Sequence, residues 1–418
     1  MKPPLGFSSW LEVQPYLKKR ASQIFSLIAN YATQSYRSGG VSQTFAQSHT
    51  LTRSTPRYVW DDSGQFVSIA ANQPCYEYAP ATGEAKGLFL NPESVTNICV
   101  PSYVSGGAGV TITPCISIFG AANAAYKVES VTNNVSQFNP ALTSSGMRYV
   151  CGAILEQGNA AASNLGIYNR TTSSYVSQAD FNWASKTFSA NTGTDPSKSQ
   201  GAQKLLEVGP NGGEIWHIWV SADIPAGNQF SGAYRDGAVN LGTGEYSYVH
   251  FHGLSTAYPI AHSIPTASVA VTCAADVCDL AALPTDYGTI GCFVINYSDP
   301  FIGSAIREML GDGANAFFQL SADNLTVSAT DGTNTASTAV TATGKNKVAV
   351  AWDATTIKIC ANGGTVVTAT HNGNLGTFAS PPRLARGVAA WYSLLQYLPS
   401  TNTGNVIATD AKMQELTT

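Results

Sequence analysis

Short segments in which apolar and polar residues alternate dominate the chain after the first 40 positions. In the segment 214–220, Ile215 and Trp219 fall on one face of the predicted strand and Ile218 falls on the other. Because both faces carry apolar side chains, we expect both to be covered. Gly, Asn and Ser interrupt such segments every ~8–12 residues, a spacing typical of a β-sandwich or jelly roll. The pattern predicts a mainly β protein.

Turn residues predict several hairpins between these strands. The sequence DDSG at 61–64 separates strand-like segments at 57–60 and 65–69, and NGG at 362–364 precedes another strand. The stretch 75–99 begins as a short strand, breaks at Pro80 and Gly83, and continues with the apolar run 87–90. We interpret this stretch as a tight hairpin that joins two parts of a β-rich protein.

Helical periodicity is confined to the two ends of the chain. Residues 10–37 repeat apolar side chains at three- and four-residue spacings, with Pro15 in the first turn and Gly39 after the last. We expect this helix to pack on its own chain or on a neighbouring subunit. Thr409 is positioned to cap a short C-terminal helix through Met413. The N-terminal stripe that we assign to attachment consists of Tyr16, Leu17, Ile24, Phe25, Ile28 and Tyr31.

The composition supports a β fold and excludes several function classes. Charged residues make up 11 % of the chain, against ~25 % in typical soluble domains. Ser, Thr, Asn and Gln provide the polarity instead, and these residues suit solvent-facing strand positions and turns. The net charge of −4, without a basic cluster, gives no reason to expect nucleic-acid binding. No apolar run is long enough for a membrane span, and the first residues lack the apolar core of a signal peptide.

The eight cysteines do not form a metal-binding pattern. None belongs to a CxxC pair, and Cys273 and Cys278 are the nearest two. Their density is far below that of disulfide scaffolds, so we expect buried free thiols. Cys273 and Cys278 are the pair to check for a disulfide.

Several motifs, taken in order, resemble a family of tailed-bacteriophage virion structural proteins. The order is the turn 61–64, the segment 78–90 (YAPATGEAKGLFL), Thr96-Asn97, SIPT at 263–266 and ADV at 275–277. DGTN at 331–334 and VAVAW at 348–352 also resemble segments of this family. Each motif is weak alone, and their shared order over residues 48–418 carries the resemblance. The family includes tail fibres, spikes and head decorations.

The resemblance implies two jelly-roll or sandwich domains. Together with the N-terminal amphipathic helix, which is predicted from residue spacing and lies outside the resemblance, this gives a mainly β architecture. We expect a helical attachment segment at 1–47 and a β-hairpin connector at 48–100. A jelly roll similar to carbohydrate-binding modules would follow at 101–262, and a concanavalin A-like (laminin G-like) sandwich at 263–418. The family also implies a homo-oligomer, most simply a homotrimer, that contacts other tail or capsid proteins.

Aromatic side chains in polar loop contexts are the candidates for glycan binding, because a sugar ring stacks on an aromatic face while amides and carboxylates bind its hydroxyls. The alternative for each of them is a position in a core or an interface. The candidates are Trp183, Tyr234, Tyr246, Tyr258 and Tyr297.

No established catalytic motif is present, and we expect no catalytic or metal-binding residue and no cofactor. Three alternatives stay open at this point. His217, His250 and His252 are spaced to allow a metal site on one strand face. Asp312 and Asp331 lie in turns that would suit calcium or would simply be good turns. Paired carboxylates would allow polysaccharide cleavage, which requires a spacing that the sequence does not show.

The sequence therefore predicts a non-enzymatic structural component of a bacteriophage particle, assembled in the host cytoplasm and exposed on the virion surface. Its N-terminal segment would anchor it. The alternatives are an adhesin of the same fold that binds a host receptor or glycan, and a polysaccharide depolymerase.

Overall fold

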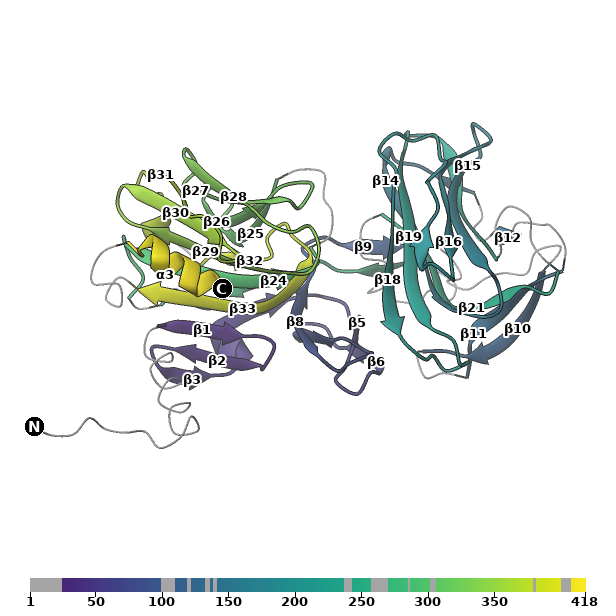
Figure 1. Ribbon diagram of the computed structural model, residues 1–418, viewed down its shortest axis with the longest axis horizontal. Coiled ribbons are helices and arrows are strands. Elements are labelled where there is room, and N and C mark those ends of the chain that lie inside the picture. The colour runs from purple at the N-terminus through teal and green to yellow at the C-terminus, as the bar shows by residue number, and fades with distance from the viewer. Residues whose placement is uncertain are drawn as a thin grey trace, which may run out of the picture.

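Two β-sandwiches lie side by side, and a short hairpin lies at their junction (Figure 1). The structure is a computed structural model. It describes residues 25–98, 110–118, 122–131, 136–137, 141–236, 243–256, 270–284, 286–300, 306–378, 381–399 and 407–418. The prediction of a mainly β protein is confirmed, and the strand pairs are antiparallel.

The first sandwich is built from the middle of the chain. Its larger sheet has the order β10 (Val110–Ile116), β11 (Ala122–Ser130), β21 (Tyr246–Ser255), β14 (Met147–Glu156), β19 (Ile215–Ile224) and β18 (Ser199–Leu206), with β9 (Val95–Asn97) paired to β21 and β22 (Val271–Cys273) paired to β9. The smaller sheet has the order β12 (Ser136–Gln137), β20 (Gln229–Asp236), β15 (Ala162–Asn169), β16 (Ser174–Asn182) and β17 (Thr187–Phe188), with β13 (Leu142–Thr143) paired to β20.

The second sandwich combines both ends of the described chain. One sheet has the order β3 (Val41–Gln43), β2 (Ser35–Ser38), β1 (Leu27–Asn30), β33 (Ala390–Pro399), β24 (Gly291–Ser298), β29 (Lys345–Trp352), β30 (Thr356–Ala361) and β31 (Val367–Thr370), with β8 (Ala85–Leu90) paired to β33 and β7 (Cys75–Tyr78) paired to β8. The other has the order β28 (Thr335–Ala339), β27 (Thr326–Thr330), β26 (Ala316–Leu320), β25 (Arg307–Gly311), β32 (Arg383–Leu384), β23 (Val277–Leu280) and β4 (His49–Thr52).

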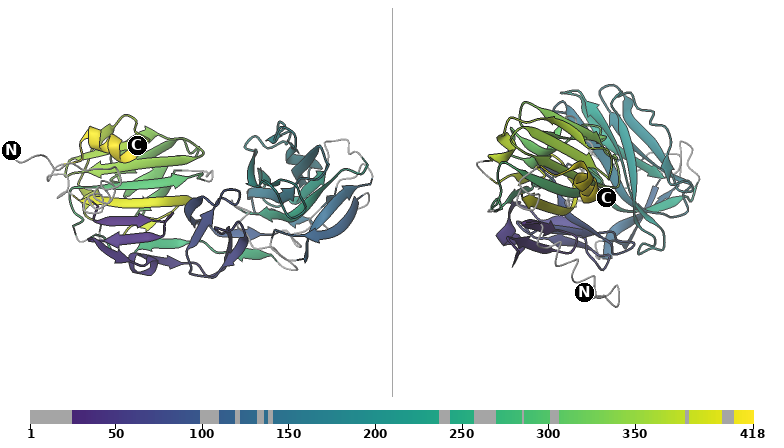
Figure 2. Two further views of the ribbon diagram at one scale, coloured as in Figure 1. Left: turned by 60° about the horizontal axis from the view of Figure 1, so that its bottom comes forward. Right: turned by 60° about the vertical axis from the view of Figure 1, so that its left-hand side comes forward.

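The remaining elements are short. The hairpin at the junction consists of β5 (Arg57–Trp60) and β6 (Phe66–Ile69). The helical elements are α2 (Phe45–Ser48), the 3₁₀ helix η2 (Asn374–Gly376) and α3 (Asp410–Thr417). Helix α3 lies on the outer face of the second sandwich (Figure 2), and Thr409 caps it by accepting a hydrogen bond from the Lys412 N–H, as predicted. None of the described helices is long and apolar enough to cross a membrane.

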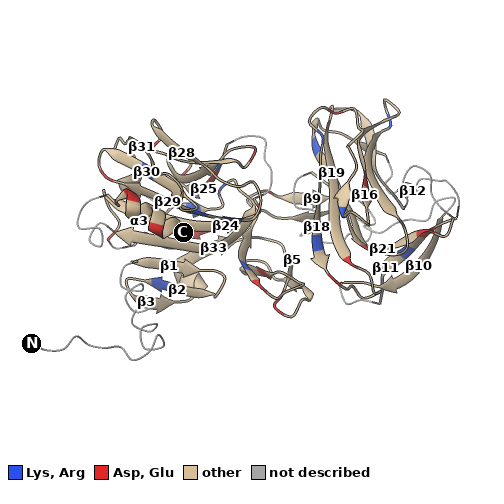
Figure 3. Cartoon of the chain, in the orientation of Figure 1, with Lys and Arg blue, Asp and Glu red and all other residues tan. Residues whose placement is uncertain are grey.

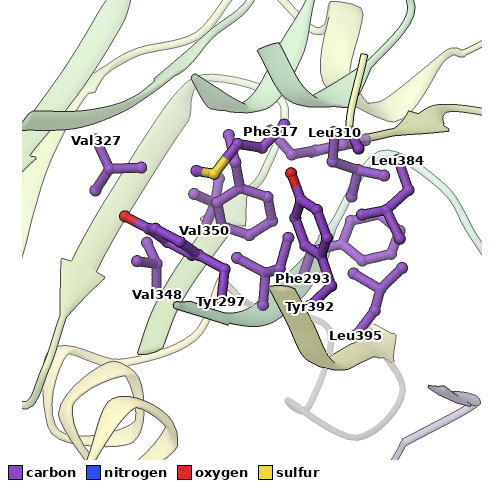
Figure 4. Close-up of a cluster of buried hydrophobic side chains, with 14 of the residues drawn as sticks. Phe293, Tyr297, Leu310, Phe317, Val327, Val348, Val350, Leu384, Tyr392 and Leu395 are labelled. Atoms are coloured by element: carbon purple, nitrogen blue, oxygen red, sulfur yellow. The ribbon is translucent and has the colours of Figure 1, made fainter. Parts of the chain in front are cut away.

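Alternating side chains build a separate core in each sandwich. In the first, Ile218 and Val220 of β19 pack against Leu165 and Phe181 of the opposite sheet. On the other face of β19, Ile215 packs in a second cluster, so both faces are covered, as the sequence predicted. Figure 4 shows the second core, where residues of one sheet meet those of the other: Phe293, Tyr297, Val348, Val350, Tyr392 and Leu395 face Leu310, Phe317, Val327 and Leu384. Burial of each such side chain stabilises the fold by about 1.5–3 kcal/mol.

The N-terminal helix prediction is wrong where the structure describes it. Residues 27–38 form the hairpin of β1 and β2, and Leu27 pairs with Tyr397 of β33. The pairing overrides the helical spacing because in a strand Leu27 and Ala29 face the core together. Of the attachment residues, Tyr16, Leu17 and Ile24 lie outside the described residues. Phe25 and Tyr31 pack in the second sandwich, and Ile28 is half-buried in β1.

Strands from the expected attachment segment and connector belong to the second sandwich. β4 pairs with β23, and β8 pairs with β33, 300 residues further on (Leu90 with Ala390). The hairpin predicted within 75–99 is present as β7 and β8. It contributes to a sheet because its apolar run alternates, with Leu88 and Leu90 in the core and Phe89 on the outer face.

Candidate functional site

The β5–β6 hairpin contacts both sandwiches. Trp60 and Phe66, with ring centroids 4.9 Å apart, pack against the outer face of the larger sheet of the first sandwich. Val59 packs with Phe89 and Trp391 on the outer face of the second. The alternation of a single strand, β5, thus places neighbouring residues against different sandwiches.

A buried ionic cluster lies beside this hairpin. Arg53 donates to Asp276 Oδ1 at 3.2 Å, and Arg57 donates to Asp276 Oδ2, with every one of these side chains at most 1 % exposed. The Asn91 N–H donates to Asp276 Oδ2 at 2.7 Å. Arg53 also donates to the carbonyls of Ala70 and Gln73. A single carboxylate therefore ties together the β5–β6 region, the end of β8 and the start of β23.

Cysteines lie against the same cluster. Arg57 Nε is 3.4 Å from Cys273 Sγ. Burial raises the pKa of the Cys75 thiol to about 11, although Arg53 and Arg57 act in the opposite direction. The seven described cysteines are free thiols, so Cys273 and Cys278 are not bridged, and Cys278 lies in the core of the second sandwich.

Two turns from the motif order contact one another. Gly64, with φ of +75°, lies so close to Pro80 that a Cβ there would be 3.1 Å from the Pro80 carbonyl oxygen. Gly87 has φ of +109°, and a Cβ would be 2.3 Å from the Tyr392 carbonyl oxygen. Glycine is needed at position 87 because the backbone of β8 approaches that of β33 closely there, beside the bulge between β7 and β8. The turn at 61–64 therefore contacts the motif at 78–90, and Asp276 of the motif at 275–277 binds Asn91, which directly follows that motif.

A cleft of about 310 Å³ lies between the sandwiches. Strand β18 forms the side of the first sandwich that faces the second (Figure 1). Trp219 of β19 is half-buried and lines the cleft. The cleft is lined by Ser199, Gln200, Ala202, Gln203, Trp219, Asp299, Pro300, Asp323, Asn324, Ala342, Thr343 and Trp391.

A second hollow, of about 470 Å³, opens on the first sandwich and is strongly polar. Tyr246 and Tyr248 meet edge to face there, and Lys127 Nζ lies 4.0 Å from the Tyr246 ring centroid. Lys186 binds both Glu214, at 2.6 Å, and Gln157, at 2.8 Å. In this hollow Lys186 and Glu214 are already paired with each other, and Gly158 packs against the Tyr246 ring. This hollow offers less stacking surface than the cleft.

The predicted glycan-binding aromatics do not come together. Trp183, Tyr234 and Tyr297 are buried, which corrects the expectation that they face solvent from loops. Trp183 donates to Ser163 at 3.0 Å and packs in the first core, and Tyr297 packs in the second. Tyr246 is half-buried in the polar hollow, and Tyr258 lies outside the described residues. Polar neighbours are a poor guide to exposure here, since the buried Trp183 directly follows the exposed Asn182.

Trp219 lines the cleft but was not among the sequence candidates. The alternation of 214–220 placed it on the same face as Ile215, and both faces were expected to be covered. The register contained the missing signal, because Trp219 lies opposite Gly201 of β18. A Cβ at Gly201 would be 2.2 Å from Trp219 Cζ2, so the glycine makes room for the indole.

The three histidines have separate partners. His250 Nε2 binds Glu156 Oε2 at 3.0 Å, whereas His252 Nε2 lies 3.5 Å from Cys151 Sγ. The His217 ring lies 5.0 Å from that of Trp219. No cluster of metal-ligating residues occurs in the described part of the chain.

The turn aspartates proposed for calcium are used as hydrogen-bond acceptors. Asp331 accepts from the backbone N–H groups of Thr333, Asn334 and Asn372 and from the Asn334 side chain, at 2.6–3.0 Å. Burial would raise the pKa of Asp331, but these donors lower it to about 2. Asp312 accepts from Ala314 and Asn315. Both residues stabilise their turns directly.

Comparisons with known proteins give little further information about this chain. No protein-family model matches the chain, and no curated protein matches it. A similar solved structure is that of the mouse laminin alpha1 chain, domains LG4-5, at 11 % identity. The match covers 72 % of this chain and 90 % of that one, with a TM-score of 0.20. The class that the structure itself defines is a mainly β protein with several antiparallel sheets.

Proposed function

We propose that this chain is a non-enzymatic structural component of a bacteriophage particle, exposed on the virion surface as a tail fibre, spike or head decoration. The observation that carries this proposal is the junction around Asp276. Asp276, from the motif at 275–277, accepts a hydrogen bond from the N–H of Asn91, which directly follows the motif at 78–90, 185 residues earlier in the sequence. A junction of this kind holds two β bodies at a fixed angle, which is a mechanical role.

The use of the buried carboxylates supports a passive role. Asp276 binds two guanidinium groups, and Glu156 accepts from Asn211, Gly213 and His250. Each of them holds separate segments together, and none is aimed into the cleft. The release of new reducing ends from host capsular polysaccharide would contradict the non-enzymatic part of the proposal.

The surface supports assembly with other proteins. Charged residues are sparse and scattered over both sandwiches (Figure 3), so large areas present small polar groups. Removing water from such areas costs less free energy than removing it from charged areas. The proposed state is a homotrimer, and light scattering of the purified chain measures its mass.

Attachment is assigned to residues 1–24, because residues 25–43 belong to the second sandwich. Ala29, Tyr31 and Tyr36 lie in its core. Removing residues 1–24 is therefore expected to prevent incorporation into particles while the rest of the chain stays folded. Removing residues 1–43 is expected to destabilise the second sandwich as well. If the shorter deletion still assembles into particles at the normal level, the anchor assignment is wrong.

The location is tested on purified virions. An antibody against the chain, with gold labelling, is expected to mark a fixed part of the particle surface. In the truncation experiment, an Asp279→Asn variant serves as the matched control, because its ion pair with Arg383 is partly exposed. Absence of the chain from purified particles would contradict the proposal.

A further inference from the structure

The cleft between the sandwiches has an aromatic wall that is fixed in place. Trp219 packs beside the cluster formed by Trp60 and Phe66, and its indole lies against Gly201. The His217 ring lies 5.0 Å from it with an interplanar angle of 33°. These contacts restrict the indole, and its exposed part lines the cleft. A restricted aromatic face loses little entropy when a ligand stacks on it.

The polar groups around the cleft are amides, carboxylates and the hydroxyls of Ser199 and Thr343. Gln203 lines it from the first sandwich, and its side chain makes no hydrogen bond to any described residue. Asp323 lines it from the second sandwich and is held by the Ser321 hydroxyl and the Leu325 N–H, both of which bind Oδ1. Asp299 is fixed by the Gly344 N–H at 2.7 Å. The two aspartates are thus acceptors whose orientation is set before a ligand arrives, and Gln203 adds an amide donor and acceptor.

The charge of the lining selects the class of ligand. Two aspartates and no lysine or arginine line the cleft. Two nearby cations are engaged with lining residues, since Lys86 lies over the Trp391 ring and Arg307 donates to Asn324. Phosphorylated, sulfated or carboxylated ligands would therefore meet two carboxylates with no cation in the lining, which costs binding energy. A purely apolar ligand would leave Gln203 and the aspartates desolvated and unpaired. A ligand with apolar C–H faces and many uncharged hydroxyls satisfies both the indole and the polar rim.

We propose that this cleft binds a neutral saccharide. One sugar ring stacks on Trp219, and its hydroxyl groups bind Gln203 and Asp323, one from each sandwich. The cleft volume of about 310 Å³ is at the lower end of the ~300–1,000 Å³ range of small-molecule sites, which suits a short saccharide. The inference goes beyond the structural role and does not depend on it, since particle labelling tests that role separately.

The test is a glycan array probed with the full-length chain, with neutral and acidic glycans printed together. Binding to neutral glycans is expected, followed by a titration with the best neutral oligosaccharide. Trp219→Ala is expected to weaken binding about tenfold or more, because stacking is lost, while Trp219→Phe keeps part of it. Gln203→Ala, a change to a strand-edge side chain without described partners, is expected to weaken binding severalfold without changing the melting temperature.

Tyr248→Phe in the polar hollow is the matched control and is expected to leave binding unchanged. If Trp219→Ala lowers the melting temperature, Gln203→Ala and Asp323→Asn decide the question. No binding to any glycan at millimolar concentration would overturn the proposal. A preference for acidic glycans would also overturn it. So would binding by the Gln203→Ala and Asp323→Asn variants that is as tight as that of the wild-type chain, or a loss of binding seen only in Tyr248→Phe.

Discussion

Arg53 donates a hydrogen bond to Asp276 at 3.2 Å although 223 positions separate the two residues in the chain. Arg57 shares the same carboxylate, and both guanidinium groups are buried. A buried ion pair contributes modest net stability, but removing one partner leaves charge without compensation. Removing a charged residue of this cluster is therefore expected to destabilise the junction.

The first prediction concerns this carboxylate. Asp276→Asn is expected to destabilise the protein by about 3–5 kcal/mol, since two buried guanidinium groups lose their counter-charge. Urea unfolding followed by tryptophan fluorescence measures the change. Asp279→Asn, three residues away, breaks a pair with Arg383 that is 35 % exposed on both sides, and is expected to cost no more than ~1 kcal/mol. Equal losses in the two variants would contradict the role of the cluster.

The second prediction concerns mild acid. Burial lowers the pKa of His49 and of His252 to about 3, so both are neutral in the folded protein. In the unfolded chain each binds a proton near pH 6.5, so stability is fully present above that pH and falls as the pH drops toward 3. Between pH 7 and pH 5, each histidine is expected to lower the free energy of unfolding by about 2 kcal/mol.

Urea midpoints measured at pH 7 and pH 5 check this loss. The double variant His49→Gln, His252→Gln is expected to flatten the dependence on pH, because glutamine does not titrate. A wild-type protein with the same free energy of unfolding at both pH values would show that these histidines are not buried as described.

The third prediction concerns Gly87. Gly87→Ala is expected to cost about 3 kcal/mol or more, because a Cβ meets the Tyr392 carbonyl oxygen and the φ of +109° is strained for alanine. Gly40→Ala tests the conformational part alone, since Gly40 has φ of +80° and open space around it, and is expected to cost ~1 kcal/mol. Thermal melting compares the two. A smaller loss at position 87 than at position 40 would be inconsistent with the close approach of β8 to β33.

The fourth prediction concerns calcium. Adding EDTA or millimolar calcium is expected to leave the melting temperature unchanged, because N–H donors already surround the Asp331 carboxylate. Asp331→Ala is expected to destabilise by about 1–3 kcal/mol through loss of these acceptors, and Asp312→Ala, at an exposed turn, by less. A calcium-dependent rise of several degrees that disappears in Asp331→Ala would reverse this interpretation.

Local patterns in the sequence determined much of the β fold. Alternation set the two faces of β19, the DDSG turn set the β5–β6 hairpin, and Thr409 set the start of α3. These features depend on neighbours within a few residues, so their signals are readable without knowing the rest of the molecule.

Contacts between distant segments decided the rest. Residues 27–38 form strands because β33 offers an edge to pair with, which outweighs a helical spacing that no partner supports. The cleft also depends on how distant segments are brought together, because Trp219 and Asp323 come from different sandwiches. Trp183 has polar sequence neighbours and Trp219 has apolar ones, yet Trp183 is buried and Trp219 lines the cleft, because only the tertiary structure fixes which surfaces other segments cover.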